Sequence, residues 1–126
     1  MICFDGFASE DNVPIYLQIV GFVKRGIVAG TISDGDEMPS RRVLSATLGV
    51  NPNTVQKSYA MLEQQGLIHS RTGAKSFVRV APETIPALRE EILAASLKSM
   101  VEAMKQMGMT CGEAQASIAK FWEVEE

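Results

Sequence analysis

Apolar residues recur at intervals of three and four positions in the first third of the chain. The recurring positions are Ile15, Ile19, Phe22 or Val23, and Ile27. This spacing is typical of a helix with one buried side. Pro14 fits the first turn, where a missing N–H has no partner to lose, and Gly30 ends the pattern. We therefore predict a helix over residues 14–30.

Two shorter helical patterns follow, with almost no chain between them. Ser40 can cap the first of them, and Gly49 ends it. Asn51 can cap the second, Pro52 suits its first position, and Gly66 ends it. The buried positions would be Val43, Leu44 and Leu48 in the first helix and Val55, Tyr59 and Leu62 in the second. Two short helices joined by a tight turn with a glycine predict a helix-turn-helix.

The pattern changes after Gly66. Residues 67–71 and 76–80 are short and rich in β-compatible residues, and residues 72–75 between them contain Gly73. This arrangement predicts a β-hairpin, the wing that follows a helix-turn-helix in many DNA-binding proteins.

A long helical pattern occupies residues 85–107, and Gly108 breaks it. Thr110 and Glu113 have the spacing of a capping box, so a last helix should run to about residue 123. The predicted fold is mainly α with a small β-hairpin. A winged helix-turn-helix domain would occupy residues 1–81, and a two-helix dimerisation tail would occupy residues 82–126.

Charge is distributed unevenly along the chain. Residues 40–80 contain six basic residues and one acidic residue, Glu63, a net charge of +5, and the whole chain has −3, so the remainder carries −8. The basic residues are Arg41, Arg42, Lys57, Arg71, Lys75 and Arg79. Such segregation favours an anionic partner for the middle of the chain, although a charged run is often only a solvated surface.

Composition argues against an enzyme. His69 is the single histidine, which excludes a catalytic triad and a multi-histidine metal site. No paired carboxylates, nucleophile–base set or phosphate-cradling glycine loop stands out, so we expect no catalytic residues, metal or cofactor. Cys3 and Cys111 form no C-x-x-C pair, and we expect reduced thiols.

The hydropathy pattern and the first residues predict a cytoplasmic protein. No apolar run approaches the roughly 18 residues that a membrane span requires, so we expect no membrane association. Residues 1–8 contain no basic residue, unlike a secretory signal.

Four motifs in this order resemble the GntR family of bacterial repressors. They are PIYLQI at residues 14–19, MPSRRVL at 38–44, VNPNTV at 50–55 and LEQQGLI at 62–68. The resemblance covers about residues 12–80 and implies a winged helix that binds DNA. About 45 residues remain after Ala81. This length is similar to the YtrA-like subfamily, which implies dimerisation through the tail and regulation of a neighbouring ABC-transporter operon.

Eight residues are the candidates for DNA contact. Asn53, Gln56 and Lys57 lie on the outward face of the second short helix, and these residue types read base edges in the major groove. Arg41 and Arg42 begin the helix that Ser40 caps, where cations oppose the helix dipole, so phosphate contact explains them better than helix stability does. The other candidates for contact with the DNA backbone are Thr54, Arg71 and Lys75. Lys75 stands where the family wing usually has its second glycine. This departure argues against a minor-groove approach by the wing backbone, whereas a lysine at this position can reach a phosphate.

The tail should hold two copies together. The expected dimerisation residues are Leu88, Ile92, Met100, Met104, Phe121 and Trp122. We therefore expect a homodimeric transcription factor, a repressor, with double-stranded DNA as its partner. The sequence leaves open a small-molecule effector, which it does not identify. It also leaves open a winged-helix module that binds protein instead of DNA.

Overall fold

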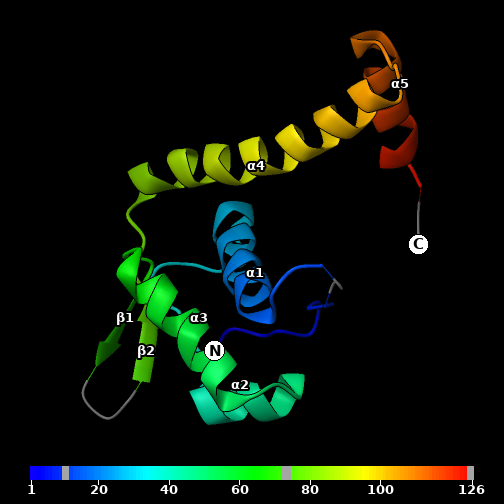
Figure 1. The fold of residues 1–126 in the computed structure, drawn as a ribbon. Helices are drawn as coiled ribbons and strands as arrows, with labels where there is room; N and C mark the ends of the chain where they lie inside the picture. The colour runs from blue at the N-terminus through cyan, green and yellow to red at the C-terminus, as the bar shows by residue number, and fades with distance from the viewer. Residues whose placement is uncertain (10–11, 72–74, 125–126) are drawn as a thin grey trace. The chain divides into compact units, whose positions relative to one another are not determined.

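The structure, a computed structural model, describes residues 1–9, 12–71 and 75–124 (Figure 1). The chain forms two compact units, Met1–Arg89 and Glu90–Glu126. The division falls eight residues after the domain boundary that the sequence predicts. The reason is that the first turns of the long helix belong to the first unit, where the Leu88 side chain is buried.

The predicted helices and hairpin are present. The first unit contains α1 (Ile15–Ala29), α2 (Arg41–Leu48), α3 (Pro52–Gln64), β1 (Ile68–Arg71) and β2 (Lys75–Val78). A short 3-10 turn (Pro82–Thr84) precedes α4 (Ile85–Gln106), and α5 (Cys111–Trp122) follows. The fold class predicted from the sequence, mainly helical with a small antiparallel hairpin, is confirmed. None of the described helices combines the length and hydrophobicity that crossing a membrane requires.

Helix α1 begins one position later than predicted. Pro14 is its cap residue and lies outside the first turn, and its carbonyl accepts hydrogen bonds from the N–H groups of Leu17 and Gln18. The Gln18 side chain also donates to the Val13 carbonyl (2.6 Å). The last helical position is Ala29, and Gly30 follows with a positive φ.

Helix α3 is the centre of the first unit, because it packs against α1, α2 and β1 (Figure 1). Its predicted stripe of Val55, Tyr59 and Leu62 is fully buried. Ser58 is buried as well, and its hydroxyl donates to the Tyr16 carbonyl of α1 (3.1 Å). This bond fixes α3 against α1 at a position where the sequence predicts no contact.

A third segment is bridged to the two-stranded sheet of the wing. β1 and β2 pair in the antiparallel sense, with Ile68 opposite Val78. Residues 36–38 pair with the other edge of β2: the Val78 N–H donates to the Asp36 carbonyl (2.8 Å) and the Met38 N–H to the Ser76 carbonyl (2.9 Å). The predicted wing turn at residues 72–75 falls mostly on residues 72–74, which lie outside the described part of the chain.

An N-terminal arm, residues 1–7, covers α1. Ile2 and Phe4 are buried, and the Phe4 ring stacks on Phe22 of α1 with 4.7 Å between ring centroids. The Ile2 N–H donates to the Glu37 carbonyl (2.9 Å), so the arm adds to the segment that pairs with β2. From the sequence we expect only a lead-in here, because its two phenylalanines, Phe4 and Phe7, make no periodic pattern.

The second unit is a helical pair with an apolar surface. Gly108 has a φ of 73° between α4 and α5, and the predicted capping box of Thr110 and Glu113 is formed in both directions. The hydrogen bond from the Thr110 N–H lowers the pKa of the Glu113 carboxyl. Many of this unit's large apolar side chains are exposed.

Two glycines in the middle of α1 provide a test of the packing. A Cβ on Gly26 would collide with the buried side chain of Ile32, whereas a Cβ on Gly21 would meet only the end of the exposed Arg25 side chain (Nη1, 2.9 Å). Both changes to alanine gain about 1 kcal/mol of helix propensity. We expect Gly21→Ala to raise the free energy of unfolding, and Gly26→Ala to lower it by about 1–3 kcal/mol through overpacking.

Urea unfolding of the two variants, followed by circular dichroism, measures both effects. A change of the same sign in both variants would show that the α1–Ile32 packing is not as close as described.

Candidate nucleic-acid interface

Local hydrogen bonds set the turn between α2 and α3. The Ser40 hydroxyl accepts from the Val43 N–H (3.1 Å) and caps α2 as predicted. Gly49 has a φ of 68°, a conformation that other residues rarely adopt, and it ends α2. The Ser45 hydroxyl donates to the Val50 carbonyl (2.6 Å) across this turn. The Asn51 side chain then accepts from the Asn53 N–H (2.7 Å), so α3 begins immediately.

The outward face of α3 is polar. Asn53, Gln56 and Lys57 are exposed, and Thr54 is half-buried beside them. All four lie in the N-terminal half of the helix, the part that enters the major groove in helix-turn-helix proteins. The structure therefore places these four predicted residues together on one exposed surface.

Lys57 has a neighbour that the sequence does not indicate. Its ammonium nitrogen lies 4.0 Å from the centroid of the Tyr16 ring of α1. At exposed sites such a cation–π contact contributes about 0.5–1 kcal/mol. The lysine is thus held against α1 at the edge of the α3 surface.

Arg41 is half-buried above Tyr59. Its guanidinium carbon lies 4.8 Å from the Tyr59 ring centroid, and no described group accepts a hydrogen bond from its buried Nε. The Tyr59 hydroxyl donates to the Pro39 carbonyl (2.6 Å), and burial raises the pKa of this phenol against the opposing effect of Arg41. Tyr59 therefore stays neutral and positions an arginine that has an unused donor. Arg42, its neighbour, is exposed.

The wing holds two cations opposite each other. Arg71 pairs with Lys75 across the two strands, and both side chains are exposed. Like charges at directly opposed positions destabilise a sheet, so an anion beside them would relieve a built-in repulsion. The Arg71 guanidinium lies over the Phe77 ring (4.6 Å), which restrains one of the two charges.

Glu63, the one acidic residue among residues 40–80, has a structural contact within the fold. Glu63 accepts a hydrogen bond from the Ser70 N–H (3.1 Å) and so ties the end of α3 to β1. Within the described ranges, no three His, Cys, Asp or Glu residues come close enough together to hold a metal ion.

Sequence reasoning misses the aromatic supports of this surface. Tyr16, Tyr59 and Phe77 each lie under one cation, yet their partners are 41, 18 and 6 positions away in the chain. Phe77 and its partner Arg71 both belong to the hairpin that the sequence predicts. The other two pairs depend on how α1, α2 and α3 pack.

A helix-turn-helix with an exposed polar second helix, followed by a basic wing, defines a winged-helix DNA-binding protein. Residues 15–78 match the family model described as "Bacterial regulatory proteins, gntR family". The chain belongs to this GntR family of transcriptional regulators, which act by binding DNA and are not enzymes.

Relatives of similar length support this assignment. The chain is 32% identical to the Bacillus subtilis protein named "Uncharacterized HTH-type transcriptional regulator YhcF", over 90% of this chain and 94% of the relative. It is 29% identical to "HTH-type transcriptional repressor YtrA" of Bacillus subtilis, over 90% of this chain and 83% of the relative.

Solved structures agree. A GntR family transcriptional regulator from Listeria monocytogenes superposes with a TM-score of 0.78 at 32% identity, and the match covers 93% of this chain and all of that one. The DNA-binding domain of AraR, solved in complex with operator ORE1, matches 56% of this chain and 87% of its own, with a TM-score of 0.50 and 31% identity.

The opposed wing cations give a prediction that needs no DNA. Lys75→Gln removes the repulsion with Arg71, so it should raise the free energy of unfolding by about 0.2–1 kcal/mol at low salt. The gain should disappear at about 1 M salt, because the screening length is then only about 3 Å. Urea unfolding at both salt concentrations checks this, and a loss of stability at low salt would show that the two side chains do not repel each other.

Proposed function

We propose that this regulator is a repressor that binds a palindromic operator as a homodimer. The observation that carries the proposal is the single exposed surface formed by the N-terminal half of α3, with cations of α2 and the wing in the same compact unit. The relative named as a repressor, which matches along most of both chains, supports the sign of regulation.

Base reading is assigned to the exposed residues of α3. Asn53 and Gln56 have the side-chain amide that pairs with adenine, and Lys57 can donate to guanine. A base contact is worth about 1–3 kcal/mol, and leaving the Tyr16 ring costs Lys57 about 0.5–1 kcal/mol, so the move to a base edge is favourable.

Contact with the DNA backbone is assigned to the residues around that helix. They are Arg41, Arg42, Thr54, Arg71 and Lys75. Arg41 has the strongest structural argument among them, because the Tyr59 ring holds its guanidinium in place while the side chain stays partly exposed. These contacts supply affinity for any DNA and little sequence preference.

A second copy of the chain is the proposed partner of the tail. A stripe of exposed apolar residues runs along α4, through the turn after it and into α5: Leu93, Leu97, Met100, Val101, Met107, Ile118, Phe121 and Trp122. Met100 is 42% exposed, Phe121 72% and Trp122 84%. Ile92 and Met104 are half-buried and border this stripe. Leu88 differs from the other predicted dimerisation residues, because it is only 7% exposed and packs within the first unit.

The regulated genes follow only from resemblance. The YtrA-like length and tail favour a neighbouring ABC-transporter operon, and a regulator of such an operon would act in the cytoplasm. Selecting bound sequences from random DNA would give the operator directly, and a palindrome in the selected sites would support binding by a two-fold symmetric dimer.

Two substitutions separate base contact from phosphate contact. Lys57→Ala should weaken binding to the selected operator by about 1–3 kcal/mol per subunit, and binding to a scrambled sequence much less. Arg42→Ala should weaken both DNAs alike and reduce the salt slope by about one per lost contact. Fluorescence anisotropy titrations at several salt concentrations measure both.

Stability provides the control. Arg42 lies in the first turn of α2 and Lys57 on an exposed face of α3, so alanine at either position should leave the fold intact. Equal weakening of both DNAs by Lys57→Ala would assign Lys57 to the backbone. Unchanged DNA binding in both variants would favour the protein-binding alternative.

The dimer can be tested in the full-length chain. Leu97→Glu places a charge in the apolar stripe of α4 and should convert the dimer to a monomer, because an unpaired charge in an interface is costly. Ser99→Glu makes the same charge change two positions along α4, away from the stripe, and should leave the dimer intact. Sedimentation velocity distinguishes the two states. A dimer that survives Leu97→Glu would place the interface elsewhere.

A further inference from the structure

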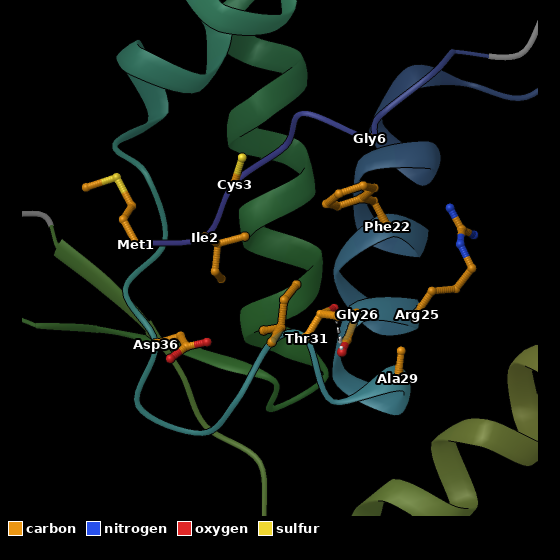
Figure 2. Close-up of a pocket in the computed structure, with 11 residues that line it drawn as sticks. Met1, Ile2, Cys3, Gly6, Phe22, Arg25, Gly26, Ala29, Thr31 and Asp36 are labelled. Atoms are coloured by element: carbon orange, nitrogen blue, oxygen red, sulfur yellow. Dashed lines mark hydrogen bonds between the residues drawn. The ribbon is translucent and has the colours of Figure 1, made fainter.

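A cavity of about 720 Å³ lies between the N-terminal arm, α1 and residues 31–36 (Figure 2), and none of its lining residues is among those assigned to DNA. Its volume is in the range of small-molecule sites, about 300–1,000 Å³. All of its lining residues belong to the first unit. Neither the family match nor the DNA-binding surface explains why this space is open.

The apolar part of the cavity is built from the arm and α1. Phe22 of α1 lies beside it, held by the Phe4 ring that stacks on it (4.7 Å) and by the edge of Phe7 (5.9 Å). Gly26 brings the Ile32 side chain directly onto α1, and both residues line the cavity. Aromatic and aliphatic side chains therefore line one side of the cavity.

Two charged residues lie on opposite sides of the cavity (Figure 2). Arg25 extends from α1, and its guanidinium folds back beside Gly21. A Cβ added to Gly21 would lie 2.9 Å from Nη1 of Arg25. Asp36 lies across the cavity, and one of its oxygens accepts from the Ser33 N–H (2.8 Å). An occupant with an anionic group would bind at Arg25, and a hydrogen-bond donor on its other end would suit Asp36.

We propose that this cavity is an effector site for a small amphipathic anion with an aromatic or branched apolar body. The apolar lining binds the body, and Arg25 binds the anionic group. This is a ligand site of the free protein, and its regulatory consequence rests on the DNA binding proposed above.

The cavity wall is directly connected to the wing. Asp36 lines the cavity, and its backbone carbonyl accepts from the Val78 N–H of β2 (2.8 Å). The next residue, Glu37, binds the arm through Ile2 and forms a bridge with Phe77. Phe77 is the ring under Arg71. An occupant that shifts the arm or Asp36 thus acts on the strand that positions a wing cation.

A pair of fluorescent probes tests the site without DNA. Anilinonaphthalene sulfonate has an aromatic body and an anionic group, and N-phenyl-1-naphthylamine is the same body without the sulfonate. We expect both to bind the full-length protein. Arg25→Gln should weaken binding of the sulfonate about two- to five-fold, as for an exposed ion pair, and leave the neutral probe unchanged.

Two further variants control for binding elsewhere. Ala29→Phe fills the cavity from the exposed end of α1 and should abolish this binding of both probes. Lys98→Gln removes a cation from α4 in the second unit and should change neither. Probe affinities that are unaffected by Arg25→Gln and Ala29→Phe would place the probes on the apolar tail and overturn the proposed site.

The regulatory step has its own readout. With the cavity saturated by the sulfonate probe, the affinity for the selected operator should change by at least about five-fold in the parent protein and not in Ala29→Phe. If the probe binds in the cavity and operator affinity stays the same, the effector role is wrong. If the chain binds no DNA at all, the probe titrations still decide whether the cavity is a ligand site.

Discussion

Tyr59 connects the parts on which the DNA-binding surface depends. Its side chain is fully buried in α3, and its hydroxyl donates to the Pro39 carbonyl, one residue before the cap of α2. Burial raises the pKa of the phenol, so the hydroxyl stays protonated and can donate at neutral pH. The same ring lies under Arg41. The start of α2, the orientation of α3 and the position of one cation therefore follow from a single buried side chain.

Cations of the first unit lie on aromatic rings in a repeated arrangement. Lys57 lies over Tyr16, Arg41 over Tyr59 and Arg71 over Phe77. A long basic side chain has many rotamers, and fixing them on binding costs free energy. A ring beneath each charge reduces that cost while leaving the charge available. The arrangement suits a protein that must bind a polyanion although its own net charge is negative.

Backbone hydrogen bonds link the N-terminal arm to residues 36–38, and link residues 36–38 to the hairpin. Backbone hydrogen bonds run from Ile2 to Glu37, and from residues 36 and 38 to both sides of Phe77 in β2. A two-stranded hairpin is only marginally stable alone. The extra segment anchors the wing to the core and connects it to the N-terminal arm.

Sequence alone determined the helices, the turn between α2 and α3 and the exposed face of α3. These features depend on local signals: the caps at Ser40 and Asn51, the positive φ of Gly49 and a buried stripe with helical spacing. Local signals act within a few residues, so they can be read without a fold. The short β-compatible stretches on either side of residues 72–75 predicted the wing in the same way.

The tertiary structure decided what distant segments do to one another. The stacking of Phe4 on Phe22 and the cation–ring pairs of Lys57 and Arg41 join residues that are 18 to 41 positions apart. The cavity likewise brings together residues from Met1 to Asp36. Leu88 shows the same limit, since helical spacing places it in the tail stripe while packing buries it in the first unit. Periodicity says which side of a helix is apolar, but only the packed chain determines which surface covers it.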